Sequence, residues 1–361
     1  MKIMYIVYKV FSKVGQKISY RINKNRIDKN RINKNNNLNY YELDSDRLFK
    51  SFKRLPESIT KQYSKGIWVN SQYSAGLKLG FVTASSIVNI KILYKKKSVF
   101  NHMSIKGISG VDVYVKNDSS YKWITCISPL SNIEMIAECE LDLQKGDKQV
   151  ELFLPPFAQI ERILVGVDHD YKLNMVTNSY NDSILIYGSS ISQGSAASRP
   201  SMSYGNIIAR KLKCDIVNMG FSESAKGEEE LINYIASINS KVIIMEYDHN
   251  VTVEELKKTH YNVYEIFRKY NQNSLIIMMT RFSGGLSITL SEERQRIAIV
   301  KETFERAINN GDYNVEIVYG NNIFPSCKDD YFVDDRHPND IGMMLIAECI
   351  CDVIWKRGLY D

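Results

Sequence analysis

The chain has 361 residues, of which 44% are hydrophobic and 24% charged, and a formal net charge of +6 at pH 7. This composition is that of a globular protein with room for two domains, and it excludes a disordered or fibrous chain. The six cysteines are scattered, with no CxxC pair and no histidine at zinc-site spacing. This pattern favours reduced thiols over a disulfide framework or a structural zinc site.

Residues 1–40 form a segment with its own composition. Ten Lys and Arg residues against one acidic residue, Asp28, precede Tyr40, so the rest of the chain is neutral or slightly acidic. Apolar residues from Ile3 to Ile18 recur at helical spacing, with basic residues on another face, which predicts an amphipathic helix able to lie on an anionic membrane. The Lys, Arg and Asn-rich stretch behind it predicts a flexible tether. A solvated tail without function and RNA affinity by charge alone are the alternatives.

The same end of the chain bears on location. Lys9 interrupts the first apolar stretch and no small-residue cleavage site follows, so a secretory signal is not expected. No apolar run reaches the roughly eighteen residues that a membrane span requires. With the cysteine pattern, this predicts a cytoplasmic protein, peripheral on the inner face of the membrane through residues 1–40. The Lys, Asn and Ile-heavy composition is associated with low-GC bacteria.

Residues 41–175 contain short runs that alternate between apolar and polar residues, separated by Gly, Asn, Asp and Lys-Gly-Asp turns. The runs are GLKLGFVT, SIVNIKILYK, VDVYVKN, YKWITCI, KQVELFLP and RILVGVD. Period-two alternation in short runs at this spacing predicts an antiparallel β-sandwich, with no helix interrupting it.

Residues 181–361 have a different organisation, in which strands and helices alternate. Strands are expected at SILIYG, DIVNMGF, KVIIMEYD, SLIIMMTR and VEIVYG. Helices are expected around SYGNIIARKL, GEEELINYIAS, VEELKKTHYNVYEIFRKY, SEERQRIAIVKETFERAI and NDIGMMLIAECICDVIWKR. Because the strands are apolar throughout, the pattern predicts a parallel sheet covered on both faces, with a functional site beyond the carboxyl ends of its strands.

The first of these strands leads into the serine-rich turn of LIYGSSISQGSAASRP, residues 185–200. A phosphate loop is excluded, because five residues separate Gly188 from Gly194 and a serine follows where lysine is required. Ser190 replaces the second glycine of a dinucleotide fingerprint, and Ser192 replaces the glycine of an α/β-hydrolase nucleophile elbow. What remains is G-x-S at a strand end, in which Ser190 is a candidate nucleophile that needs an adjacent base.

His337 is the candidate base. It stands in FVDDRHPND, between the last strand and the last helix, with Asp334 three residues earlier, so one loop can present both side chains. An aspartate bonded to the imidazole fixes its tautomer and stabilises the imidazolium that forms when the serine proton is taken. Asp335 is the neighbouring alternative, and it is expected to be solvated.

The other histidines are weaker candidates. His102 and His169 lie in the β-rich part, and His260 falls inside an ordinary amphipathic helix, where a surface or packing role is expected. His249, beside Asp248, could form a second acid–base pair or supply metal ligands. No further ligand follows nearby, so a wall of the pocket is the expected role.

These motifs, in this order, resemble those of the SGNH, or GDSL-type, hydrolase superfamily. YGSSISQG, NMGFS, MEYDHN and VDDRHPND resemble the branch in which GSS replaces GDS. GVDVY, residues 110–114, is similar to the G-x-D-L-Y motif of that branch's N-terminal sandwich. The resemblance covers about residues 60–357. It implies a flavodoxin-like three-layer α/β/α domain with a parallel sheet, preceded by an antiparallel, jelly-roll-like β-sandwich.

The resemblance also implies the roles of the site residues. Ser190 would be the nucleophile, His337 the general base and then acid, and Asp334 the residue that orients it. The N–H groups of Ser190 and Gly220 and the side-chain amide of Asn250 would form the oxyanion hole. The third block reads EYDHN here, where the wider family has G-x-N-D, so the choice of Asn250 follows the pattern of the branch.

The implied activity is that of a serine esterase that removes small acyl groups, above all O-acetyl groups on carbohydrate, through an acyl-enzyme and without cofactor or metal. An O-acyltransferase acting on a surface polysaccharide with the same triad and a non-catalytic glycan-binding relative are the alternatives. The expected partner is an acylated small molecule or glycan, with no specific nucleic acid. Arg199 and His249 are candidate substrate contacts, and packing is the alternative for Arg199.

Overall fold

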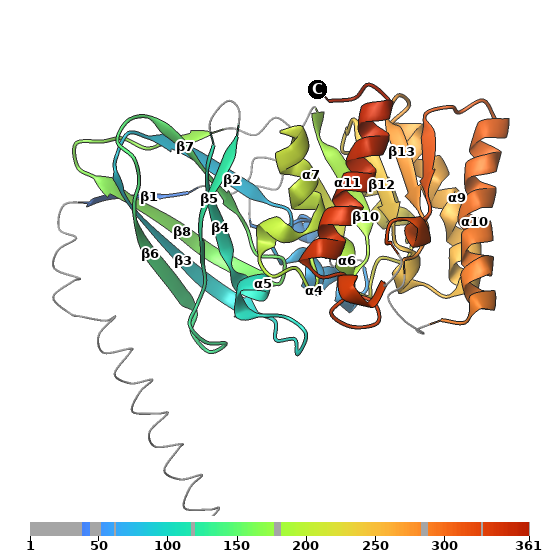
Figure 1. Cartoon of the computed structure of the whole chain (residues 1–361), viewed down its shortest axis with the longest axis horizontal. Helices are drawn as coiled ribbons and strands as arrows, with labels where there is room; N and C mark the ends of the chain where they lie inside the picture. The colour runs from blue at the N-terminus through green and yellow to red at the C-terminus, as the bar shows by residue number, and fades with distance from the viewer. Residues whose placement is uncertain are drawn as a thin grey trace, which may run out of the picture.

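The computed structural model describes residues 38–43, 52–60, 63–116, 120–176, 182–282, 288–325 and 328–360. The amphipathic helix and tether expected near the N-terminus therefore lie outside the described residues, apart from the last few of residues 1–40. Two layered sheets form one half of the molecule, and a helix-covered sheet forms the other (Figure 1). Within the described ranges, no helix is both long and apolar enough to cross a membrane.

The N-terminal half is an antiparallel β-sandwich, as the alternating runs predict. One sheet has the order β1 (Leu38–Glu42), β8 (Ala158–Asp168), β3 (Ile87–Lys97), β6 (Ile136–Asp142). The other has the order β5 (Tyr121–Ile127), β4 (Val111–Lys116), β7 (Lys148–Phe153), β2 (Lys78–Thr83), β9 (Asn174–Val176). Their inward side chains form one core, which includes Phe81, Ile90, Val113, Val150 and Val165.

The sandwich differs from the prediction in three respects. Strand β1 spans the expected boundary between residues 40 and 41, and strand β6 was not expected, because Ala137 and Cys139 in its sequence have weak strand preference. The expectation of no helix was wrong. Three helices occur in the part of this half that the structure describes, α3 (Glu57–Thr60), α4 (Lys65–Ser71) and α5 (Ile105–Ser109). They are too short for a periodic pattern, and their local signals are slight: an acidic first turn at Glu57 and the capping hydroxyls of Ser64 and Ser104.

The C-terminal half is built on a parallel sheet, which confirms the predicted fold class. Its strand order is β11 (Ile216–Gly220), β10 (Ile184–Gly188), β12 (Val242–Glu246), β13 (Leu275–Met279), β14 (Val315–Val318). In chain order this is 2-1-3-4-5, the flavodoxin-like arrangement, in which the order of the strands reverses beside β10. The ends of β10, β11 and β12 meet there, so the residues that follow them share one edge.

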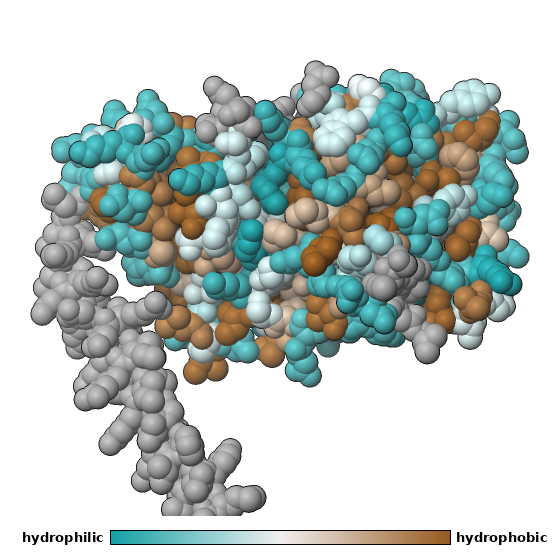
Figure 2. Space-filling model, viewed as in Figure 1, coloured by the Kyte–Doolittle hydropathy of each residue, from teal (hydrophilic) through white to brown (hydrophobic). Residues whose placement is uncertain are grey.

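Helices cover both faces of this sheet. One face packs against α8 (Glu229–Ala236), α9 (Val253–Tyr270) and α10 (Leu290–Asn309), and the other against α7 (Tyr204–Leu212) and α11 (Asp340–Lys356). Each interface is a separate apolar core, which explains why the strands are apolar throughout. Apolar side chains of α11 also reach the surface (Figure 2), and there Ile341, Met344 and Met202 line a shallow hollow.

The GVDVY motif lies at the interface between the two halves. Asp112 is fully buried, accepts the Ser201 N–H at 2.8 Å and pairs with Arg199 at 3.2 Å. Tyr114 shares a hydrogen bond with the Ser201 hydroxyl at 3.1 Å and accepts one from Arg199 at 3.1 Å. Oδ1 of Asp112 accepts the Trp123 indole N–H within the sandwich, whereas Oδ2 and the Tyr114 hydroxyl have their partners in the segment that leads into α7, so the motif joins the two halves.

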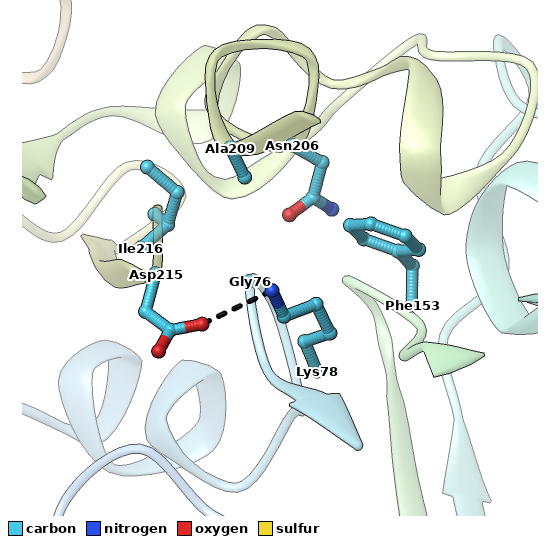
Figure 3. A pocket seen from close by; sticks show the side chains of 7 residues that line it. All are labelled: Gly76, Lys78, Phe153, Asn206, Ala209, Asp215 and Ile216. Carbon is cyan, nitrogen blue, oxygen red and sulfur yellow. Dashed lines mark ion pairs between the residues drawn. The ribbon is translucent and has the colours of Figure 1, made fainter. Parts of the chain in front are cut away.

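A second polar contact between the halves lies beside strand β11. Lys78, on β2, pairs with Asp215 at 3.1 Å, immediately before β11 (Figure 3). The pair borders a small cavity lined by Gly76, Lys78, Phe153, Asn206, Ala209, Asp215 and Ile216. Burial opposes the charge of Lys78, but Glu151 and Asp215 outweigh it and raise the pKa of the ammonium group. The two halves thus share charged as well as apolar contacts.

Arg54 makes a third connection. Its side chain is 0% exposed, and its guanidinium donates to four carbonyl groups, those of Asn70 (2.6 Å), Tyr73 (3.1 Å), Asn218 (3.2 Å) and Gly220 (2.5 Å). It also lies over the ring of Phe221, 4.8 Å from the ring centre. Burial lowers the pKa of Arg54 to about 9. The residue binds the N-terminal segment to the turn that follows β11.

Candidate active site

The serine-rich turn lies where the sheet topology places a site. Gly188, the last residue of β10, pairs in register with Gly220 of β11 and with Glu246 of β12. Two residues later Ser190 opens the short helix α6 (Ser190–Gln193). N–H groups in the first turn of a helix have no partner inside the helix, so the Ser190 N–H is suited to bind an oxygen.

The structure brings together the three residues proposed as a triad. The Oγ of Ser190 lies 2.9 Å from Nε2 of His337, and Nδ1 of His337 lies 2.8 Å from Oδ2 of Asp334. Both distances are those of ordinary hydrogen bonds, and the order serine, histidine, aspartate is that of a catalytic triad. The hydrogen bond between Ser190 and His337 gives the serine proton a direct path to Nε2 of the histidine.

Asp334 rather than Asp335 contacts the histidine. Oδ1 of Asp334 accepts the N–H groups of Arg336 (2.9 Å) and His337 (2.7 Å), which leaves Oδ2 for the imidazole. Burial opposes ionisation of Asp334, but these hydrogen bonds outweigh it and lower the pKa of the carboxyl group. The Asp335 side chain is 52% exposed and faces Arg336. The spacing of three residues thus allows one turn to hold the side chains of both Asp334 and His337.

The other serines of the turn hold the candidate nucleophile, Ser190, in place. Ser189 caps α6 through the Ile191 N–H, and its hydroxyl donates to Glu246 at 2.9 Å. The Ser192 hydroxyl binds Glu246 at 2.5 Å and Tyr204 at 2.6 Å. Glu246 is buried beneath the turn and satisfied by these donors. The serines on either side of Ser190 are thus explained by a buried carboxyl group that requires hydroxyl partners.

We expect Glu246→Gln to gain stability relative to the wild type as the pH rises. Burial raises the pKa of Glu246 from 4.5 to about 7, although hydrogen bonds from Ser192 and Ser189 oppose the shift. The folded protein then binds this proton more tightly than the unfolded chain, so the wild-type free energy of unfolding falls between about pH 4.5 and 7, by up to about 3 kcal/mol. Glutamine has no proton to lose. Urea unfolding of both proteins at about pH 5 and 7.5 measures this, and an unchanged difference would contradict it.

The proposed oxyanion donors converge on the same edge. The Asn250 side-chain amide donates to the Phe221 carbonyl at 2.9 Å, which leaves its second N–H for another acceptor. The Gly220 N–H donates to Oδ1 of Asn218 at 2.9 Å. Its role as an oxyanion donor stays a prediction, and it requires that this hydrogen bond be shared or exchanged when substrate binds. A Cβ at Gly220 would lie 2.4 Å from the Gln193 nitrogen, so only glycine lets α6 pack this closely.

Of the two candidate substrate contacts, Arg199 has other polar partners and His249 packs beside an aromatic ring. Arg199 is engaged by Asp112 and Tyr114 across the interface and by Ser201 in its own segment, which favours the packing interpretation over a substrate contact. The His249 side chain is 7% exposed and lies 4.9 Å from the Phe282 ring. Burial lowers the pKa of His249, so this ring is neutral.

Asp248 and His260 have structural roles. Asp248 is buried and pairs with Arg296 at 2.6 Å, so it does not form an acid–base pair with its neighbour His249. His260 is buried in α9 and bonds Thr303 at 2.8 Å, which confirms packing as its role. Burial lowers the pKa of His260 to about 3.

His102 is the residue at the site that the sequence did not indicate. It belongs to the sandwich half, between β3 and α5, yet its ring stacks on the His337 ring with centres 4.8 Å apart and planes 6° apart. Its Nε2 lies 3.0 Å from the Ser195 hydroxyl. No local motif marks it, because its position depends on the packing of two domains.

One group of side chains here has the composition of a metal site. The ligand atoms of His102, Asp334 and His337 lie within 4.8 Å of one another. His337 and Asp334 already use these atoms on Ser190 and on each other. A metal bound to both histidines would therefore compete with the hydrogen bond to Ser190.

A serine at the carboxyl edge of a 2-1-3-4-5 parallel sheet, bonded to a histidine that is bonded to an aspartate, has the geometry of the Ser-His-Asp triads found in serine hydrolases. Residues 181–355 match the model of the GDSL-like lipase/acylhydrolase family, and residues 33–173 match the GxDLY model, described as the N-terminus of SGNH-hydrolase-type esterases. The chain belongs to this family through both matches, and it is an ester-hydrolysing enzyme. No curated protein sequence matches it.

Solved structures share the whole fold at low identity. A GDSL-like lipase from Bacteroides ovatus is 21% identical, with a TM-score of 0.80 over 89% of this chain and 98% of that one. A salicylyl-acyltransferase from a tetracycline biosynthetic pathway is 19% identical, with a TM-score of 0.73 over 90% and 95%. An acetyl xylan esterase from Butyrivibrio proteoclasticus is 15% identical, with a TM-score of 0.55 over 89% and 99%. These similarities establish the two-domain fold.

Proposed function

We propose that this enzyme is a serine esterase that removes small acyl groups, chiefly O-acetyl groups, from carbohydrate. The observation that carries the proposal is the hydrogen-bonded chain from Asp334 through His337 to Ser190, at the first turn of α6. The carbohydrate part is supported by the neighbours named as carbohydrate esterases, including the acetyl xylan esterase.

The proposed reaction begins with attack of Ser190 Oγ on the ester carbonyl carbon. Nε2 of His337 takes the hydroxyl proton as the new C–O bond forms, and the Asp334 carboxylate stabilises the resulting imidazolium. Negative charge develops on the carbonyl oxygen, and the proposed donors to it are the N–H groups of Ser190 and Gly220 and the side-chain amide of Asn250. Donors fixed at this position before the reaction cost no reorganisation, which is why such a site accelerates acyl transfer.

The second half of the reaction releases the products. His337 gives its proton to the leaving alkoxide oxygen, so the sugar hydroxyl departs and the acyl group stays on Ser190. Water then attacks the acyl-enzyme with His337 as base, and acetate leaves. If a second hydroxyl compound replaces water, the same steps transfer the acyl group instead. An O-acyltransferase acting on a polysaccharide is therefore the second candidate, and the acyltransferase of similar fold supports it.

Turnover of p-nitrophenyl esters from acetate to octanoate, then of acetylated xylan, tests the proposal. The purified protein should release p-nitrophenol fastest from acetate and free acetate from the glycan, and Ser190→Ala should do neither. Release of p-nitrophenol that rises on addition of a glycan acceptor, with acyl groups recovered on that acceptor, would favour the transferase. A folded protein that binds the glycan without turning over any ester would overturn both and leave a binding protein.

A cytoplasmic location, peripheral at the membrane through residues 1–40, is also part of the proposal. It is supported by the basic, amphipathic sequence of that segment and by the scattered cysteines. Cell fractionation of the full chain, with and without salt washing, tests it. Recovery outside the cell would contradict the location, and complete absence from the membrane fraction would contradict the peripheral attachment.

A further inference from the structure

The sandwich contributes an aromatic support for the catalytic histidine. The His102 ring lies parallel to the His337 ring, with centres 4.8 Å apart. Phe100 packs on His102 with ring centres 5.6 Å apart, and Phe100 in turn packs edge-to-face on Phe157, 5.0 Å away. Phe157 is fully buried. The row of rings therefore extends from the interior of the protein to the catalytic base and limits the movement of the His337 imidazole.

A hydrogen bond fixes the rotation of the His102 ring. Its Nε2 lies 3.0 Å from the Ser195 hydroxyl. Ser195 belongs to the nucleophile turn, since its N–H donates to the Ser190 carbonyl at 2.9 Å. His102 is therefore linked to the nucleophile through Ser195 and to the base through stacking. Movement of the loop between β3 and α5, which carries His102, relative to α6 would therefore disturb both Ser190 and His337.

The charge of His102 suits a stacked partner of an imidazolium. Burial and the neighbouring His337 lower the pKa of His102, against the opposing effect of Asp334, so the ring is neutral at neutral pH. His337 and Asp334, both from the loop before α11, are the titratable groups that act on it. A neutral aromatic face stabilises a cation above it, whereas a second cation would repel it. The imidazolium formed on His337 during acyl transfer therefore lies against a favourable surface.

We propose that His102 is a positioning residue that holds the His337 ring between Ser190 and Asp334 and stabilises its protonated form in the transition state. This inference rests on the proposed function, because it concerns the same reaction. It assigns the sandwich a direct part in catalysis, through a side chain that contacts the catalytic base.

Three substitutions of His102 separate the contribution of its ring, which stacks on His337, from that of its hydrogen bond to Ser195. His102→Ala removes both, His102→Gln can keep a hydrogen bond to Ser195 but has no ring, and His102→Phe keeps a ring face without the hydrogen bond. On p-nitrophenyl acetate, we expect Ala and Gln to lower kcat roughly 5- to 30-fold with little change in KM, and Phe to recover most of the loss. His169→Gln, at an exposed histidine of the same domain, is the matched control and should keep the wild-type rate.

The pH dependence of kcat/KM distinguishes this role from a purely structural one, because loss of packing alone would not shift it. Without the ring face, the imidazolium of His337 is less stable, so the acid limb of kcat/KM should shift to lower pH in Ala and Gln but not in Phe. Wild-type rates and profiles in all three variants would overturn the inference, as would equal losses in Gln and Phe. Labelling of Ser190 by a fluorophosphonate separates the two failures. A wild type that neither labels nor hydrolyses contradicts the proposed function, whereas an active wild type with active variants contradicts only the role of His102.

Discussion

Loss of Ser190 or His337 is expected to abolish ester hydrolysis. Ser190→Ala and His337→Ala should each lower kcat by about 10³- to 10⁶-fold, and the double variant should be little worse than either, because the two groups act as one unit. The reason is the 2.9 Å hydrogen bond between them, through which the proton must pass. Steady-state rates on p-nitrophenyl acetate measure the effect. A double variant with twice the free-energy loss of the single ones would mean that the residues act independently.

Asp334→Asn gives a sharper version of the same test, with Asp335→Asn as its neighbour control. The asparagine amide would disfavour the tautomer of His337 that accepts the serine proton, so kcat should fall by up to about 10⁴-fold while KM changes little. Asp335 contacts Arg336 and not the imidazole, and its substitution should leave the rate near wild type. The reverse pattern would transfer the orienting role to Asp335.

Replacement of Arg54 is expected to lower the free energy of unfolding more than the other substitutions described in this Discussion. Arg54→Met would leave the carbonyl groups of Asn70, Tyr73, Asn218 and Gly220 without this buried donor. Each unsatisfied buried acceptor costs about 1 to 3 kcal/mol, and partial relaxation makes the sum smaller than additive, so we expect a loss of at least about 3 kcal/mol. Urea unfolding at neutral pH, followed by tryptophan fluorescence, measures the change.

Two comparison variants define what Arg54 contributes. Arg54→Lys keeps a cation but has three donors on one atom instead of a planar fork, so it should recover only part of the loss. Lys301→Ala removes an exposed ion pair with Glu305 and should cost no more than about 1 kcal/mol. Equal stability of Arg54→Met and Lys301→Ala would show that the four carbonyls find other donors. Because Arg54 binds the Gly220 turn, a loss of activity should accompany the loss of stability.

The parts of the fold and site predicted from sequence are those with local signals. The five parallel strands follow from their apolar runs, and Asp334 and His337 share one loop, so their spacing alone shows that they can meet. The register of Gly188 with Gly220 explains why motifs about thirty residues apart converge. The strands and the Asp334–His337 pair thus have signals within a few residues, and the parallel sheet brings the separate motifs together.

The parts that were missed depend on contacts between the two halves. His102 has no motif around it, and its place at the site follows from the packing of a sandwich loop on the nucleophile turn. Arg54 reaches the β11 turn from a segment 164 residues away. Arg199 resembled a substrate ligand because its partners, Asp112 and Tyr114, come from the other domain. Such contacts cannot be derived from periodicity or from residue spacing.

The GVDVY contact has a consequence for how this enzyme can be changed by recombination. Asp112 and Tyr114 bond to the hydrolase segment, and Arg54 donates to the carbonyls of Asn218 and Gly220, so the two halves are not independent modules. A hydrolase domain grafted without its own sandwich would lose three buried anchors and expose the surface that they cover. Exchange between related enzymes should therefore succeed when the crossover lies outside residues 54–337, and fail when it falls at the apparent domain boundary.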